Sequence, residues 1–102
     1  MGRKRPARTA RRAQARAARQ LVRDKEQLAG LVAGGAAERP IEVSSSAVIE
    51  VRARSLPCPQ CEGPYKIDDH RSTGGLRPVD VTCQRCGVAR TLWFRIVSAD
   101  PN

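Results

Sequence analysis

Two cysteine pairs of the form Cys-X-X-Cys constrain this chain more than any other feature of its sequence. Cys58 and Cys61 form the first pair, Cys83 and Cys86 form the second, and 21 residues separate them. Zn²⁺ prefers four tetrahedral ligands, and four thiolates complete this set without water. Within each pair, a tight turn can place both sulfurs on one metal. The spacing therefore predicts one closed, structural zinc site with no open position for Lewis-acid chemistry.

The residues around the pairs alternate between apolar and polar, which is typical of half-buried strands. The expected strands are 49–57, 65–68, 79–83 and 90–97, so that each cysteine pair lies at the tip of a hairpin. Ile41 and Val43 indicate a short additional strand, with residues 44–46 as a turn. Gly63 and Gly87 are expected to supply the unusual φ angles of the cysteine turns. Residues 69–78 are expected to form a loop.

The motif CPQC…CQRCG, flanked by short strands, resembles the zinc-ribbon family over roughly residues 48–97. The resemblance implies antiparallel β hairpins that hold one zinc ion through Cys58, Cys61, Cys83 and Cys86. Zinc ribbons serve in transcription, in ribosomes, in nucleic-acid enzymes and in protein docking. The resemblance therefore predicts a scaffold and leaves the activity open.

Other uses of paired cysteines fit the sequence less well. A redox site of the glutaredoxin type needs a βαβ scaffold with the pair at the start of a helix. Here Pro57, Pro59 and Pro64 surround the first pair, and no helical pattern follows. The segment CPQCEGPY also matches most of the CxxCxGxG repeat of DnaJ-type chaperones, but it has Tyr65 where the repeat has its second glycine. Structural disulfides need an oxidising compartment, whereas the sequence shows no secretory signal, so we expect a cytoplasmic protein.

The net charge of +9 comes entirely from the N-terminal segment. Residues 1–23 hold nine basic side chains and no acidic one, whereas residues 24–102 hold ten of each sign. The nine are Arg3, Lys4, Arg5, Arg8, Arg11, Arg12, Arg16, Arg19 and Arg23. Such an asymmetry predicts an interaction segment for an anionic partner, and nucleic acid, DNA or RNA, is the leading candidate. A solubilising tail and an organellar transit peptide are alternative interpretations.

Residues 7–33 are rich in Ala, Arg, Gln and Leu and are predicted to be helical. On a helix, five of the arginines fall within an arc of about 80°. We call them the arginine stripe: Arg8, Arg12, Arg16, Arg19 and Arg23. Four side chains on the opposite side form an apolar face, which could bind a protein partner: Leu21, Leu28, Leu31 and Val32. Residues 1–20 are expected to fray when free, because their arginines repel one another.

These patterns predict a small α+β protein with two parts. Residues 1–40 would form the basic helix and a flexible Gly-rich linker, and residues 41–98 would form the four-cysteine ribbon. Trp93 and Arg95 share one face of the last strand and could add a stacking contact to nucleic acid; alternatively Trp93 packs under the helix.

The remaining features do not indicate catalysis. His70 is the only histidine and is expected to be a solvated loop residue rather than a further ligand. The sequence contains no recognisable catalytic arrangement, so we expect a protein that is not an enzyme. No apolar run is long enough to span a bilayer.

Overall fold

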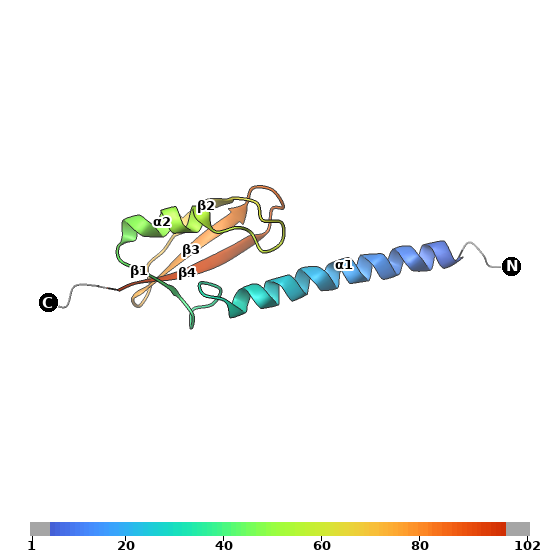
Figure 1. The fold of residues 1–102 in the computed structure, drawn as a ribbon, viewed down its shortest axis with the longest axis horizontal. Coiled ribbons are helices and arrows are strands. Elements are labelled where there is room, and N and C mark those ends of the chain that lie inside the picture. The colour runs from blue at the N-terminus through green and yellow to red at the C-terminus, as the bar shows by residue number, and fades with distance from the viewer. Residues whose placement is uncertain (1–4, 98–102) are drawn as a thin grey trace.

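The computed structural model describes residues 5–97, which begin with a long helix, α1 (Arg5–Leu31). This helix confirms the predicted one. Between Ala7 and Asp24 every side chain is exposed, so this part of α1 owes its helical structure to residue propensity rather than to packing. Figure 1 shows α1 projecting away from the rest of the molecule, and the whole extends 79 Å in its longest direction. Arg3 and Lys4 lie outside the described residues.

The rest of the structure is built on a four-stranded mixed sheet (Figure 1). Its strands are β1 (Ile41–Val43), β2 (Tyr65–His70), β3 (Leu76–Cys83) and β4 (Ala89–Ile96), in the order β1-β4-β3-β2. β2, β3 and β4 pair antiparallel, whereas β1 runs parallel to β4. The small α+β fold and four of the expected strands are therefore confirmed, although β2 continues through His70, which was predicted to lie in a loop.

The predicted strand at 49–57 is wrong, because this segment is helical, as α2 (Ser46–Ser55). Ile49 and Ala53, four residues apart, are completely buried, whereas Val51 between them is 66% exposed. A strand would have placed all three on one face. Ser45, expected in a turn, is the N-cap residue of α2.

α2 covers one face of the sheet, and the core lies between the two layers (Figure 1). Val79 and Val81 of β3 and Leu92 and Phe94 of β4 point toward the helix and are at most 7% exposed. The opposite face carries polar contacts, including the ion pair of Arg71 with Asp80. Thr91 and Arg71 both donate to the Asp80 carboxylate, and these bonds lower its pKa.

The segment that joins α1 to β1, residues 32–40, is held by hydrogen bonds rather than extended. The backbone N–H of Trp93 donates to the carbonyl of Gly34 at 2.8 Å, which fastens this segment to β4. Arg39 donates to the carbonyl of Gly30 at 2.7 Å. The end of α1 is thereby attached to what we call the body, residues 41–97.

Candidate metal centre

The four cysteines come together at one end of the sheet. Cys58 and Cys61 follow α2, Cys83 ends β3, and Cys86 precedes β4. All four Sγ atoms lie within 4.8 Å of one another, with Cys58 to Cys86 at 3.7 Å and Cys61 to Cys83 at 3.4 Å. A tetrahedral Zn²⁺ with Zn–S bonds of about 2.3 Å requires sulfurs about 3.8 Å apart. The arrangement therefore fits a four-thiolate metal site, as the spacing predicted.

The two cysteine pairs adopt the same local structure, which we call the first turn (residues 58–63) and the second turn (residues 83–88). In both turns the N–H of the first cysteine donates to the carbonyl five residues later. These bonds join Cys58 to Gly63 at 3.1 Å and Cys83 to Val88 at 2.9 Å. The first cysteine's carbonyl accepts from the N–H four residues on, at 2.7 and 3.0 Å. Its Sγ also receives the N–H two residues on, at 3.4 and 3.3 Å. Such N–H groups stabilise thiolate sulfur, so both turns are shaped for a metal ligand.

The glycines of the turns act differently from the sequence prediction. Gly87 has a φ of +80°, as expected, but the equivalent position in the first turn is Glu62, with a φ of 63°. Gly63 instead provides space, because a Cβ there would lie 3.0 Å from the Sγ of Cys83 and 3.2 Å from that of Cys61. The absence of a side chain at residue 63 therefore lets the backbone approach the sulfurs.

The negative charge of four adjacent thiolates has to be compensated by a cation. The N–H groups of Cys86 and Arg85 lower the pKa of Cys83 to about 6, against the opposing effect of burial. For Cys86, the N–H of Val88 favours the thiolate, but burial and the neighbouring cysteine sulfurs outweigh it and raise the pKa to about 12. Four adjacent thiols cannot all ionise at neutral pH by themselves, whereas a divalent cation compensates their charge.

The other residues that the sequence singled out, including His70, which was not expected to be a ligand, do not join this cluster. His70 lies at the far end of β2, where its Nδ1 is 3.7 Å from Glu50 of α2. Trp93 is half-buried, and Arg95 forms an ion pair with Glu42 of β1. Trp93 and Arg95 therefore belong to the sheet, apart from the arginines of α1.

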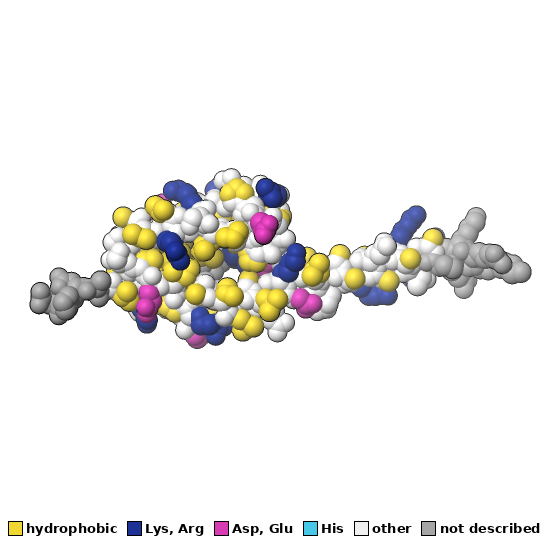
Figure 2. All heavy atoms as spheres, viewed as in Figure 1, with side chains coloured by type: hydrophobic (Ala, Val, Ile, Leu, Met, Phe, Trp, Pro, Cys, Tyr) yellow, Lys and Arg dark blue, Asp and Glu magenta, His cyan; other side chains and the backbone are white. Residues whose placement is uncertain are grey.

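The described arginines of α1 from Arg8 to Arg23 are all exposed, and Figure 2 shows basic side chains along the projecting part of the helix. The apolar face is exposed as well: Leu21 is 54%, Leu28 63%, Leu31 61% and Val32 59% exposed. These four side chains are therefore more exposed than buried, although Leu28 and Val32 lie beside Pro59 of the body. No helix among the described residues is long and apolar enough to cross a membrane.

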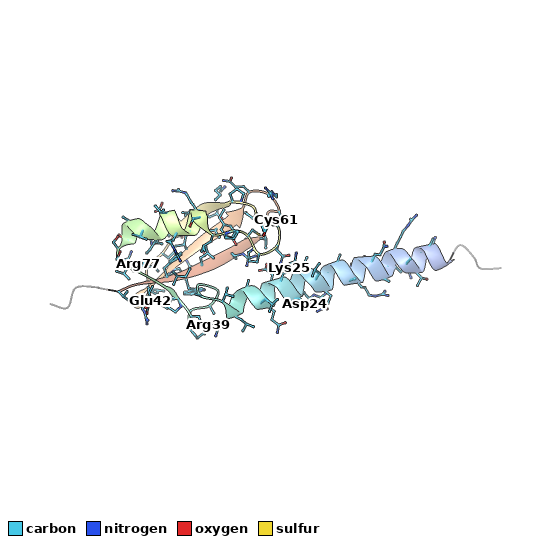
Figure 3. All side chains as sticks on the ribbon, viewed as in Figure 1. Asp24, Lys25, Arg39, Glu42, Cys61 and Arg77 are labelled. Carbon is cyan, nitrogen blue, oxygen red and sulfur yellow. The ribbon has the colours of Figure 1, made fainter. Side chains whose placement is uncertain are left out.

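Three residues that the sequence did not single out connect α1 to the body: Glu26, Gln60 and Arg90. Arg90 forms an ion pair with Glu26, and Gln60 donates to the same carboxylate. Figure 3 shows Lys25 of α1 and Cys61 of the first turn at this junction. The only sequence signal was that acidic side chains first appear on α1 at Asp24 and Glu26, where the helix reaches the body.

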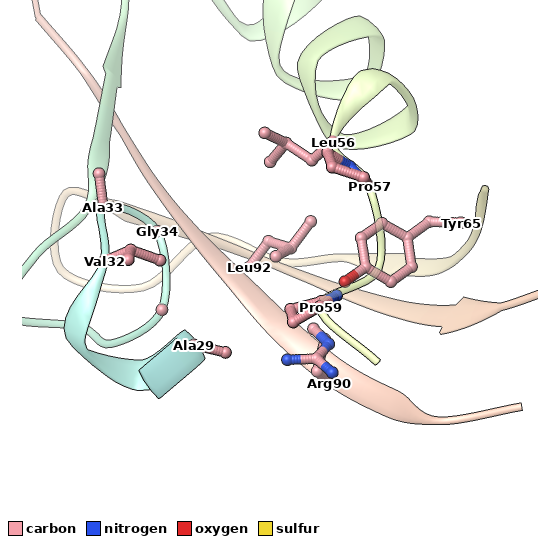
Figure 4. Close-up of a pocket in the computed structure, with 11 residues that line it drawn as sticks. Ala29, Val32, Ala33, Gly34, Leu56, Pro57, Pro59, Tyr65, Arg90 and Leu92 are labelled. Carbon is pink, nitrogen blue, oxygen red and sulfur yellow. The ribbon is translucent and has the colours of Figure 1, made fainter. Parts of the chain in front are cut away.

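A small cavity of about 90 Å³ lies at the same junction (Figure 4). Its walls are mainly apolar, with Leu56, Pro59 and Leu92 on the body and Ala29 on α1, and the Arg90 guanidinium lies against it. Tyr65 also lines it, and burial raises the pKa of that hydroxyl to about 12. Ordinary ligand pockets measure roughly 300–1,000 Å³, so this space is a packing gap at the joint.

Comparison with known protein families, with curated proteins and with solved structures finds no match for this chain. Its functional interpretation therefore depends on the metal centre and on the surfaces described above.

Proposed function

We propose that this chain is a non-enzymatic, cytoplasmic zinc-ribbon protein that binds nucleic acid through α1. The supporting observation is the separation of charge: the arginine stripe lies on the exposed, projecting part of α1, while residues 24–102 sum to zero charge. Phosphate groups are the natural partners of such a stripe, because neutralising them releases counterions. One structural zinc ion, held by Cys58, Cys61, Cys83 and Cys86, would stabilise the body from which the helix projects.

The salt dependence of binding tests this proposal. If five to nine phosphates are neutralised, the logarithm of the binding constant should fall against log salt with a slope of roughly −4 to −8. Titrations of a duplex DNA and of a structured RNA would show which nucleic acid binds more tightly. A slope near zero for both would exclude the proposal.

Matched variants identify which arginines act. Replacing Arg12 and Arg16 by glutamine should reduce the steepness of the slope by about 2, at about 0.9 per lost phosphate contact. The control is Arg52→Gln with Arg54→Gln on α2, which also removes exposed positive charge from a helix. The control should keep the wild-type slope, and an equal effect of both variants would mean that only net charge matters.

The exposed apolar face supports a second candidate, a protein adaptor. Leu21, Leu28 and Leu31 are each more than half exposed although they lie on the half of α1 that adjoins the body. In an adaptor this face would bind a partner helix, and the body would act as a rigid knob. A partner that remains bound after nuclease treatment, and that is lost in Leu28→Glu, would support this function.

A further inference from the structure

The hydrogen bonds between the first turn and α1 are all made by one residue, Gln60. Its backbone N–H points at the Sγ of Cys58 at 3.4 Å. Its side-chain Nε2 donates to the carbonyl of Val22 at 3.0 Å and to the carboxylate of Glu26 at 2.6 Å. Its own carbonyl accepts from Lys25 Nζ at 3.2 Å. Gln60 therefore has its backbone in the metal-binding turn and its side chain on the helix.

The second turn reaches the same point of α1 through Arg90. This residue follows the second turn at the start of β4, and its side chain is only 10% exposed. Its guanidinium pairs with the carboxylate of Glu26, which also accepts from Gln60. Both metal-binding turns are thus connected to one glutamate of α1. Partly buried, charge-assisted contacts of this kind are stronger than ordinary surface ones.

This connection leaves the functional surfaces of α1 free. It uses Val22, Lys25 and Glu26, whereas the arginine stripe and the apolar face remain exposed. The connection fixes the direction of the helix without covering the surfaces that a partner would contact. A rigidly held binding element loses less entropy on association than a mobile one.

We propose that Gln60 couples the four-cysteine metal site to the position of α1, so that bound metal holds the arginine stripe in a fixed direction. Metal–sulfur bonds fix the shape of the first turn, and that shape places the Gln60 side chain against the helix. When the metal leaves, the turn is no longer fixed and the helix is released. Control of nucleic-acid binding by the metal rests on the proposed function, whereas the coupling between the metal site and α1 does not.

Hydrogen exchange of the zinc-loaded full chain tests the coupling without nucleic acid. In Gln60→Ala, amides of residues 22–31 should exchange roughly tenfold faster or more, because the bond to the Glu26 carboxylate and the one to the Val22 carbonyl are lost. Bound zinc and the protection of β3 and β4 should not change. The matched control is Gln84→Ala in the second turn, whose side chain makes no hydrogen bond within residues 5–97. Equal exchange of residues 22–31 in the two variants would refute the role of Gln60.

A second arm varies the metal. Chelation followed by re-addition of zinc should release and then restore the protection of residues 22–31 in the wild type, whereas in Gln60→Ala the protection of these residues should change much less with zinc. If the protection of residues 22–31 in the wild type were the same with and without zinc, the coupling would be refuted. Salt-dependent nucleic-acid binding is measured separately: its absence would exclude the proposed function, while the exchange result would still decide the coupling.

Discussion

Residues 62 and 87 occupy the same position in the two cysteine turns, yet one is glutamate and the other glycine. Both adopt a positive φ, at 63° and 80°. A side chain in this left-handed region costs about 1–2 kcal/mol, and glycine avoids that cost. Since glycine also loses more chain entropy on folding, we expect Glu62→Gly to stabilise the zinc-loaded protein by about 0.5–1 kcal/mol.

Urea denaturation at a fixed free zinc concentration measures this effect. The reciprocal variant Gly87→Ala should destabilise by about 1 kcal/mol. If Glu62→Gly were destabilising, the exposed Glu62 side chain would have to contribute more than its backbone conformation costs.

Gly63 leads to a prediction about metal affinity. Besides its contacts with the two sulfurs, a Cβ at this position would lie 2.7 Å from the Cβ of Arg85, so the turns would have to separate. We expect Gly63→Ala to weaken zinc binding at least tenfold, about the effect of disturbing the surroundings of metal ligands. Competition with a chromogenic chelator measures this affinity. Gly30→Ala is the control, because nothing lies within 4 Å of its added Cβ, and it should leave zinc affinity unchanged.

At this scale the sequence predicted the ligands but not their surroundings. Four cysteines in two close pairs determine a metal site by their chemistry and spacing alone. The role of Gly63 depends on which atoms from the second turn lie beside it, and this contact joins segments about 20 residues apart. No local pattern carries that information.

Among the elements, α2 shows why alternation can mislead. The segment AVIEVRARS alternates apolar and polar residues, but it also places Ile49 and Ala53 four residues apart. Short segments satisfy both periods. The helix is formed because Ile49 and Ala53 both fill the space above the sheet while Val51 faces solvent. The strands 79–83 and 90–97 were predictable because their apolar residues recur at every second position and are mostly β-branched or aromatic, types that favour strands.

Two substitutions test whether the α2 segment is a helix, as in the structure, or a strand. Ile49→Ala should destabilise by about 2–4 kcal/mol because it removes a completely buried side chain. Val51→Ala should change stability by at most about 0.5 kcal/mol, since Val51 is exposed and alanine has the higher helix propensity. Chemical denaturation of both variants measures the difference. Equal losses would instead indicate that both side chains face the core.

The whole molecule combines a small body that carries the four-cysteine cluster with a projecting charged helix. The sequence predicted both parts because composition and charge change abruptly near residue 24. How they are joined was not predictable, because Glu26, Gln60 and Arg90 are far apart in the sequence and each is an ordinary polar residue there. Their proximity follows only from the folded sheet and the two turns.

Removal of the metal should therefore affect the two parts differently. Among residues 5–97 the buried apolar core has eleven members, and two of them, Cys58 and Cys83, belong to the four-cysteine cluster. Binding of a structural zinc ion contributes on the order of 10 kcal/mol or more, which is comparable to the entire stability of a domain of this size. We expect chelation to unfold residues 41–97, with loss of the near-ultraviolet circular dichroism of Trp93, while part of the helical signal of α1 remains. Zn²⁺ should restore the spectrum and Mg²⁺, which prefers oxygen ligands, should not. A melting curve unchanged by chelation would mean that the sheet and α2 are stable without metal, and that the cysteine cluster serves another purpose.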